Sequence, residues 1–185
     1  MSELGVLYWM QGIYNPALDS VMIGVTYSAT SAVLWFVLAF LMTCTWRYRR
    51  VGVAVIVSVI FAYVLVDLII KPSVDRPRPF DVGDLHLMIA PPGTSSFPSG
   101  HTASSFAAAT AILLYCRRAG LLAMAYAALV GLSRIYLCVH WPTDVVAGAV
   151  IGVAASILVI WIMGRWIPFF RDLPDPKVPG DNPRD

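Results

Sequence analysis

The chain has 185 residues, of which 58% are hydrophobic and only 13% are charged, with a formal net charge of +2. A soluble domain carries about 25% charged residues, so this composition excludes an ordinary soluble domain and predicts a polytopic membrane protein with one domain. The small net charge gives no indication of a nucleic-acid partner. Three cysteines, in separate apolar segments, indicate neither disulfides nor a metal site.

The apolar segments predict an all-α fold, a polytopic membrane helix bundle. Residues 3–14 are apolar and aromatic but too short to cross a bilayer, so we expect them to lie at the membrane interface. Asn15-Pro16 ends that segment. Later apolar stretches predict five or six transmembrane helices, at about residues 17–28, 31–45, 51–71, 101–116, 119–138 and 143–164. We favour six, the first of them short, although the first two stretches could also form one tilted helix.

The last residues differ in composition from the rest of the chain. We assign residues 1–170 to the membrane domain. Residues 171–185 are polar, with repeated Pro and Asp and no apolar periodicity, so we expect a disordered cytoplasmic tail. The oligomeric state leaves no signal that we can interpret.

Three groups of arginines predict the orientation of the bundle. If the predicted helices alternate in direction, all three groups lie on one side, which is cytoplasmic by the positive-inside rule. A multi-pass protein of the cell membrane is therefore expected, with residues 72–100 and 139–142 on the extracytoplasmic face. The groups are Arg47, Arg49 and Arg50; Arg117 and Arg118; and Arg165 and Arg171.

Four cations do not follow this rule. Lys71, Arg76, Arg78 and Arg134 lie on or near the extracytoplasmic face, which should be poor in basic residues. A cation within a membrane span is costly and indicates a functional site. We therefore expect these residues to bind an anion.

Two clusters of polar residues flank the predicted extracytoplasmic loop. In the first, Lys71 and Arg78 supply positive charge, and the guanidinium of Arg78 offers a planar fork to phosphate oxygens. In the second, Ser99 and Gly100 begin a helix, where free backbone N–H groups form an anion site and Gly100 permits close approach. His101 lies beside that site.

A third cluster joins the last two predicted spans. His140 precedes a helix that begins near Pro142, and Asp144 lies in its first turn. The carboxylate is placed to orient the imidazole, so that the other ring nitrogen can attack phosphorus. Arg134 supplies further charge for the transition state. Two histidines suit a two-step reaction in which His140 is the nucleophile and His101 the acid and base.

Other polar residues near these clusters have simpler interpretations. His86 fits an interfacial residue, and Arg76 could simply face water. Asp67 is expected to pair structurally with Lys71, one helical turn away. The functional prediction depends on three clusters that occur in order, on one side and at consistent spacings.

At these residues the sequence resembles the type-2 phosphatidic acid phosphatase family, also called the lipid phosphate phosphatase superfamily. The family pattern is Lys, six residues, Arg-Pro; then Pro-Ser-Gly-His; then Ser-Arg, five residues, His, three residues, Asp. The matching residues are Lys71 with Arg78-Pro79, Pro98-Ser99-Gly100-His101, and Ser133-Arg134 with His140 and Asp144.

The resemblance implies a six-helix membrane bundle with the active site at its outer end. It implies metal-independent hydrolysis of a lipid phosphate, without a cofactor, through a phosphohistidine on His140. Asp144 would be the partner of His140, and His101 the acid and base. The phosphate binders would be Lys71, Arg78, Ser99, Gly100 and Arg134.

The short chain looks like the small bacterial members of that family, which act on undecaprenyl diphosphate or phosphatidylglycerol phosphate. The segment from Lys71 to Phe80 and the compact loop favour undecaprenyl diphosphate. Phosphatidylglycerophosphate and phosphatidic acid remain alternatives. So do a haloperoxidase-like oxidoreductase that holds vanadate at the same site, a lipid phosphotransferase, and a non-catalytic binder of lipid phosphates.

Overall fold

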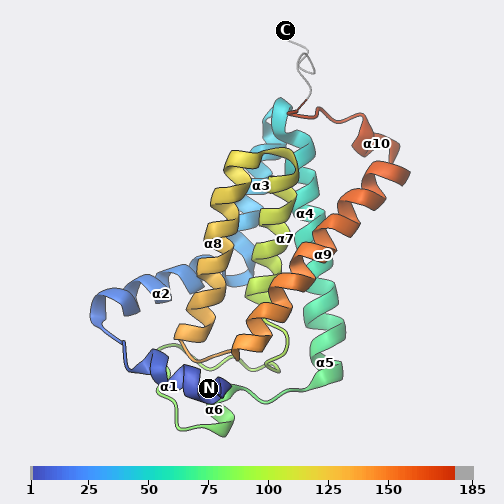
Figure 1. The fold of residues 1–185 in the computed structure, drawn as a ribbon. Helices are drawn as coiled ribbons and strands as arrows, with labels where there is room; N and C mark the ends of the chain where they lie inside the picture. The colour runs from blue at the N-terminus through green and yellow to red at the C-terminus, as the bar shows by residue number, and fades with distance from the viewer. Residues whose placement is uncertain (1, 178–185) are drawn as a thin grey trace.

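The computed structural model describes residues 2–177, which form helices and contain no strand within that range. The bundle consists of helices that stand side by side (Figure 1), and shorter helices cover its two ends. The bundle helices are α3 (Val33–Cys44), α4 (Arg49–Tyr63), α7 (Gly100–Tyr115), α8 (Arg117–Tyr136) and α9 (Pro142–Trp166). The π-helical segment η3 (Val64–Ile70) and α5 (Lys71–Val74) continue α4 downward in Figure 1.

Short elements lie at both ends of this bundle. At the lower end in Figure 1 are α1 (Glu3–Gln11) and α6 (Pro79–Val82), and at the upper end is α10 (Pro168–Arg171). The helix α2 (Pro16–Ser28) leans away from the bundle, and the single turn η1 (Thr30–Ala32) joins it to α3. A further turn, η2 (Trp46–Tyr48), joins α3 to α4.

Local sequence signals explain where these helices begin. The Asn15 side chain accepts a hydrogen bond from the Leu18 N–H at 3.0 Å, and Pro16 occupies the first helical position of α2. Ser99 caps α7, and Pro142 opens α9. These residue types satisfy the free N–H groups of a first turn or, for proline, remove one of them.

Small residues let the other helices approach α7, which lies at the centre of the bundle. A methyl group added to Gly148 would lie 2.6 Å from the carbonyl oxygen of Ser99, and one added to Gly152 would lie 2.3 Å from that of Ala103. Both distances are far below van der Waals contact, so α9 packs directly on the backbone of α7. The two glycines are four residues apart on one face of α9, and their close packing brings the start of α9 next to the start of α7.

The outer surface of the bundle is apolar. Large side chains such as Phe40, Leu122 and Trp161 are exposed on α3, α8 and α9, where a bilayer would cover them. Within residues 2–177, three helical segments are long and apolar enough to span: Trp46–Val82, Arg117–Tyr136 and Pro142–Trp166. A fourth follows if α2 and the segment Thr30–Cys44, bent by 51°, make one span.

The predicted count of six spans is therefore not confirmed. The predicted helices 17–28 and 31–45 correspond to the two arms of one bent pair. The helix α7 has only 16 residues, and other helices bury most of it. A helix enclosed by protein does not need the length or the apolar surface that lipid contact demands.

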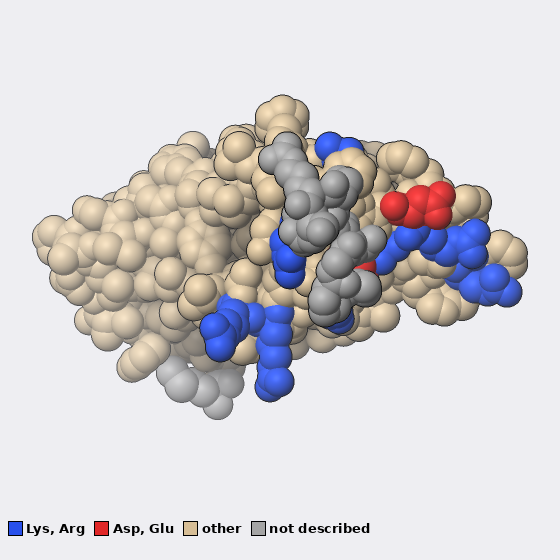
Figure 2. Space-filling model, turned by 90° about the horizontal axis from the view of Figure 1, so that it is seen from above, with Lys and Arg blue, Asp and Glu red and all other residues tan. Residues whose placement is uncertain are grey.

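The basic groups lie at the end of the bundle opposite to α1 and α6. Figure 2, which views the molecule from that end, shows Lys and Arg side chains gathered on this face. They come from the start of α4, the α7–α8 connection and the end of α9, so the three predicted groups share one end. The predicted extracytoplasmic motifs occupy the other end.

The C-terminal segment differs from the sequence-based expectation. Residues 171–177 are not a free tail, because Leu173 is buried with Phe170 against the core. Arg50 donates from Nε to the Phe170 carbonyl at 3.1 Å and forms an ion pair with Asp175 at 3.0 Å. Burial of the apolar Leu173 favours packing of this segment, although most of its residues are polar. The rest of the predicted tail, residues 178–185, lies outside the described residues.

The helix α1 lies across the lower end of the bundle, as Figure 1 shows. Leu7 is fully buried and packs against Leu85, Cys138 and Trp141, whereas Trp9 is exposed on the other side. This arrangement suits the interfacial position predicted for residues 3–14. It also places Glu3 close to the motif residues.

Candidate active site

A cavity of about 470 Å³ lies beside the motif residues and extends between η1, α3 and α4. Six of the eight predicted site residues line it: Lys71, Arg78, Gly100, His101, Arg134 and His140. The other two, Ser99 and Asp144, are completely buried behind the cavity wall. The three motifs, separated by up to about seventy residues in sequence, thus meet at one place.

The helix α8 ends between Arg134 and His140, and this end explains the spacing of the two residues. The Arg134 carbonyl accepts hydrogen bonds from the Val139 N–H at 3.2 Å and the His140 N–H at 3.3 Å. Cys138, with φ 56°, supplies the left-handed residue that such a reversal needs. This turn closes α8 and brings His140 back beside Arg134 in the cavity.

His140 is held between Asp144 and the cavity. Its Nδ1 lies 3.5 Å from Oδ2 of Asp144, an ion-pair distance that is longer than a good hydrogen bond. Its Nε2 lies 3.4 Å from Nη1 of Arg78. A proton on Nδ1 would face the carboxylate, which leaves the Nε2 lone pair directed toward the cationic side of the site.

Three further groups hold the Asp144 carboxylate. Oδ2 accepts a hydrogen bond from the Trp141 N–H at 2.9 Å and another from the Ser96 hydroxyl. Oδ1 accepts one from Nη1 of Arg76 at 2.6 Å. A fully buried carboxylate is stable only with such partners, and together they fix the oxygen that faces His140.

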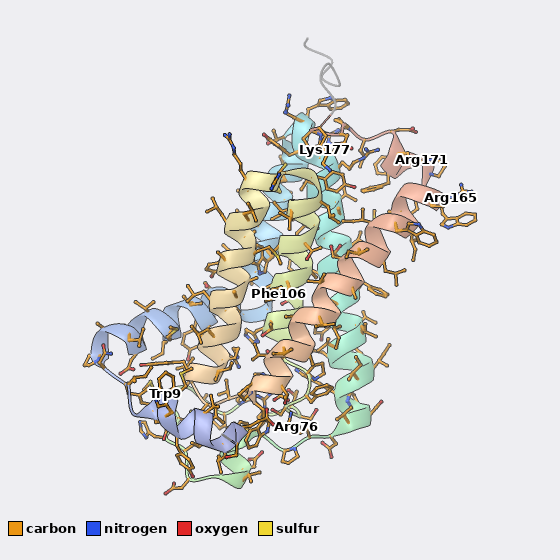
Figure 3. All side chains as sticks on the ribbon, in the orientation of Figure 1. Trp9, Arg76, Phe106, Arg165, Arg171 and Lys177 are labelled. Atoms are coloured by element: carbon orange, nitrogen blue, oxygen red, sulfur yellow. The ribbon has the colours of Figure 1, made fainter. Side chains whose placement is uncertain are left out.

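The sequence interpretation left the role of Arg76 open, between an anion-binding residue and one that faces water. Arg76 does not simply face water, because its Nη2 also pairs with Oε2 of Glu3 at 2.6 Å and its guanidinium stacks 5.2 Å from the Trp141 ring centre. Glu3 in turn accepts a hydrogen bond from the Thr143 N–H at 3.0 Å. Figure 3 shows Arg76 at the lower end of the bundle, beneath α9.

This arrangement links α1 to the histidine. A chain of polar contacts runs from Glu3 to Arg76, then to Asp144 and His140. The available sequence signal was the position of Arg76 on the face that should lack cations. Ser96 and Glu3 carried no signal, because neither belongs to a motif.

Arg78 is fixed by backbone carbonyls. Its Nε donates to the Thr94 carbonyl at 2.8 Å, and its Nη1 donates to the Val139 carbonyl at 2.6 Å. These bonds use part of the guanidinium fork and orient the rest toward His140. The site thus holds Arg78 in position before any ligand binds, which reduces the entropy lost on binding.

Lys71 and Arg134 complete the cationic lining. Nζ of Lys71 contacts Oδ1 of Asp67 at 2.5 Å, as the sequence predicted. Arg134 donates from Nη1 to the Thr26 hydroxyl on α2 at 2.6 Å, while its buried Nε has no hydrogen-bond partner. An unsatisfied buried guanidinium N–H favours an anionic ligand.

Ser99 acts as a structural cap in this arrangement. Its Oγ accepts hydrogen bonds from the Thr102 N–H at 3.4 Å and the Thr102 hydroxyl at 2.9 Å. Its N–H donates to the Asp144 carbonyl at 3.0 Å, which ties α7 to α9. Gly100, in contrast, lines the cavity at the N-terminus of α7, where the helix dipole favours an anion.

The surroundings of His140 control its protonation. Burial lowers the pKa of His140, the nearby Asp144 opposes this shift, and the cations Arg134 and Arg78 strengthen it. The imidazole is therefore neutral near pH 7, because its pKa lies below the ordinary 6.5. A neutral imidazole has the free lone pair that a nucleophile requires.

The cavity and the fold define a class of protein. A cluster of cations beside a histidine–carboxylate pair, at the end of a bundle with an apolar outer surface, suits phosphate chemistry on a membrane substrate. The chain belongs to the PAP2 superfamily, whose family model matches residues 51–168. It is a phosphatase of the group that acts on lipid phosphates.

Curated relatives carry several substrate names. An undecaprenyl-diphosphatase of Sulfolobus acidocaldarius is 33% identical over 138 residues, 74% of this chain and 61% of that protein. Undecaprenyl-diphosphatase BcrC of Bacillus subtilis is 31% identical over 146 residues, 78% of this chain and 75% of its own length. A lipid A 1-phosphatase of Rhizobium johnstonii is 31% identical over 132 residues, 68% of this chain and 53% of that protein.

A solved structure supports the fold. The crystal structure of LpxE from Aquifex aeolicus superposes with a TM-score of 0.76 and 28% sequence identity. The match covers 85% of this chain and 94% of that one. The overall arrangement of the helices is thus similar to that of LpxE.

Proposed function

We propose that this protein hydrolyses a membrane lipid diphosphate, undecaprenyl diphosphate in particular, through a phosphohistidine on His140. The observation that carries the proposal is the position of His140, with Nδ1 toward Asp144 at 3.5 Å and Nε2 toward Arg78 in the cavity. This is the geometry of an oriented nucleophile beside a phosphate site.

In the first step, Nε2 of His140 attacks the terminal phosphorus. The bond from phosphorus to the bridging oxygen breaks, and His101 donates a proton to that oxygen, so that the lipid monophosphate leaves. Asp144 stabilises the positive charge that develops on the imidazole. Lys71, Arg78 and Arg134 line the cavity where the phosphoryl oxygens gain charge, together with the backbone at Gly100.

In the second step, neutral His101 accepts a proton from water while the water oxygen attacks phosphorus. The bond between phosphorus and nitrogen breaks, which restores His140 and releases inorganic phosphate. The proton that His101 gains is the one that it donates in the next cycle. The charges that stabilise the transition state come from the protein, so we propose that hydrolysis requires no metal ion.

The cavity also has an apolar side that fits a lipid. Phe36 of α3 and Val59 and Ile60 of α4 line it next to the cations. A lipid chain could occupy this side while its phosphate reaches His140. Two of the relatives bear the name undecaprenyl-diphosphatase, which supports the choice of that substrate.

Phosphate release by the purified protein in detergent tests this proposal. The panel consists of undecaprenyl diphosphate, phosphatidylglycerol phosphate, phosphatidic acid and lipid A, each measured with and without EDTA. We expect the highest kcat/KM with undecaprenyl diphosphate and no loss of rate with EDTA. A higher kcat/KM with another lipid would identify that lipid as the preferred substrate instead. A rate abolished by EDTA would disprove the metal-free mechanism.

We further propose that the site faces the outside of the cell, since the basic groups gather at the other end of the bundle. In a background with Cys44→Ser and Cys116→Ser, a membrane-impermeant thiol reagent should label Asp84→Cys in intact cells. The matched variant Arg117→Cys should react only after lysis. The reverse labelling pattern would show that the site faces the cytoplasm.

A further inference from the structure

The cavity contains a carboxylate that the proposed mechanism does not use. Among the described residues that line it, Asp67 is the acidic one, and the cations Lys71, Arg78 and Arg134 surround the same space. Asp67 lies within η3, the π-helical continuation of α4. Such π-helical turns occur frequently at functional sites.

The position of this carboxylate is unfavourable for a phosphate. Oδ1 of Asp67 contacts Nζ of Lys71 at 2.5 Å, so one of the cations is already neutralised. A methyl group added to Gly100 would lie 2.8 Å from Oδ2 of Asp67. The carboxylate therefore stands beside the N-terminus of α7, where a phosphate is expected to bind.

The ion pair between Asp67 and Lys71 lies in the cavity itself. Lys71 is 7% exposed. Among residues 2–177, Asp67 is the carboxylate that forms an ion pair with it. The pair nevertheless lines the cavity instead of lying in the wall behind it, as Asp144 does. A phosphate that enters must displace the Asp67 carboxylate from the Lys71 ammonium. It must then bind next to the negative charge of Asp67.

We propose that Asp67 competes with phosphate for Lys71 and so weakens the binding of the phosphate product. The inference rests on the proposed function, because it assumes that phosphate occupies this cavity. Three cations and a helix N-terminus would hold inorganic phosphate tightly. A resident carboxylate lets Lys71 return to Asp67 as phosphate leaves, which speeds product release.

Vanadate binding tests the proposal without any lipid. Titration calorimetry of the purified protein in detergent would measure the Kd of orthovanadate, an analogue of phosphate. Asp67→Asn is expected to lower this Kd about tenfold, since it removes a like charge from the site and frees Lys71. Inhibition by inorganic phosphate should strengthen by the same factor.

Matched variants separate competition from general electrostatics and from folding. Asp84→Asn removes an exposed carboxylate at the same end and should leave the Kd unchanged. In a Lys71→Met background, Asp67→Asn should change the Kd by less than about threefold, because the contested cation is gone. Asp67→Ser is a second variant that removes the charge and should behave as Asp67→Asn does.

The outcomes distinguish the two proposals. A stable Asp67→Asn protein with an unchanged or raised Kd for vanadate would disprove the proposed competition. The ion pair between Asp67 and Lys71 would then have a structural role only. An undiminished effect in the Lys71→Met background would also overturn it. If the wild-type protein hydrolyses no lipid phosphate and binds no vanadate, the proposed function fails and the inference fails with it.

Discussion

Alanine at position 140 is expected to lower kcat by about 10⁴-fold or more. The change removes the atom that attacks phosphorus, and losing a covalent nucleophile has effects of this order in other enzymes. The rate of phosphate release from the best lipid of the panel measures the effect. The same preparation, quenched during turnover of a diphosphate labelled in its terminal phosphate, should carry acid-labile label in wild type and none in His140→Ala.

The matched control is His86→Ala. His86 is exposed and does not line the cavity, so its replacement should keep kcat within about twofold of wild type. Thermal unfolding should show that both variants remain folded. If His140→Ala retained more than a tenth of the wild-type rate, another group would be the nucleophile.

Replacing Arg76 with glutamine is expected to lower kcat about 10²-fold and to change KM much less. Arg76 does not line the cavity, but it donates to Oδ1 of Asp144 at 2.6 Å and so orients the carboxylate that holds His140. Hydrogen-bond partners of metal-binding side chains typically contribute 10- to 100-fold to activity, and we expect a partner of the Asp144 carboxylate to contribute to a similar extent. Steady-state kinetics with the best lipid would separate kcat from KM.

Two variants test whether Arg76 acts as a positioning residue. Arg76→Lys keeps one charged donor and should restore part of the lost kcat, which a general loss of stability would not predict. Arg118→Gln removes an exposed arginine at the opposite end of the bundle and should be silent. Equal losses in the glutamine and lysine variants, with an unchanged melting temperature, would contradict the role of the charged contact.

The motif residues could be predicted because each cluster is local. A helix start at Ser99 or Pro142 depends on the few residues around it, and the turn between Arg134 and His140 depends on one short segment. The predicted pair of Asp67 and Lys71 lies four residues apart on one helix, and it is present. Its position in the cavity was not predictable, because Gly100 of another helix determines it.

The sequence alone identified a helical membrane protein with the motifs of a phosphatase family, since apolar runs and three motifs carry that information. The count of spans depended on packing: α7 is enclosed by its neighbours, and α2 bends away from α3. The link from Glu3 through Arg76 to Asp144 joins residues that are far apart in the chain. Only the tertiary structure brings them together, because α1 must first bury Leu7 at the end of the bundle where His140 lies.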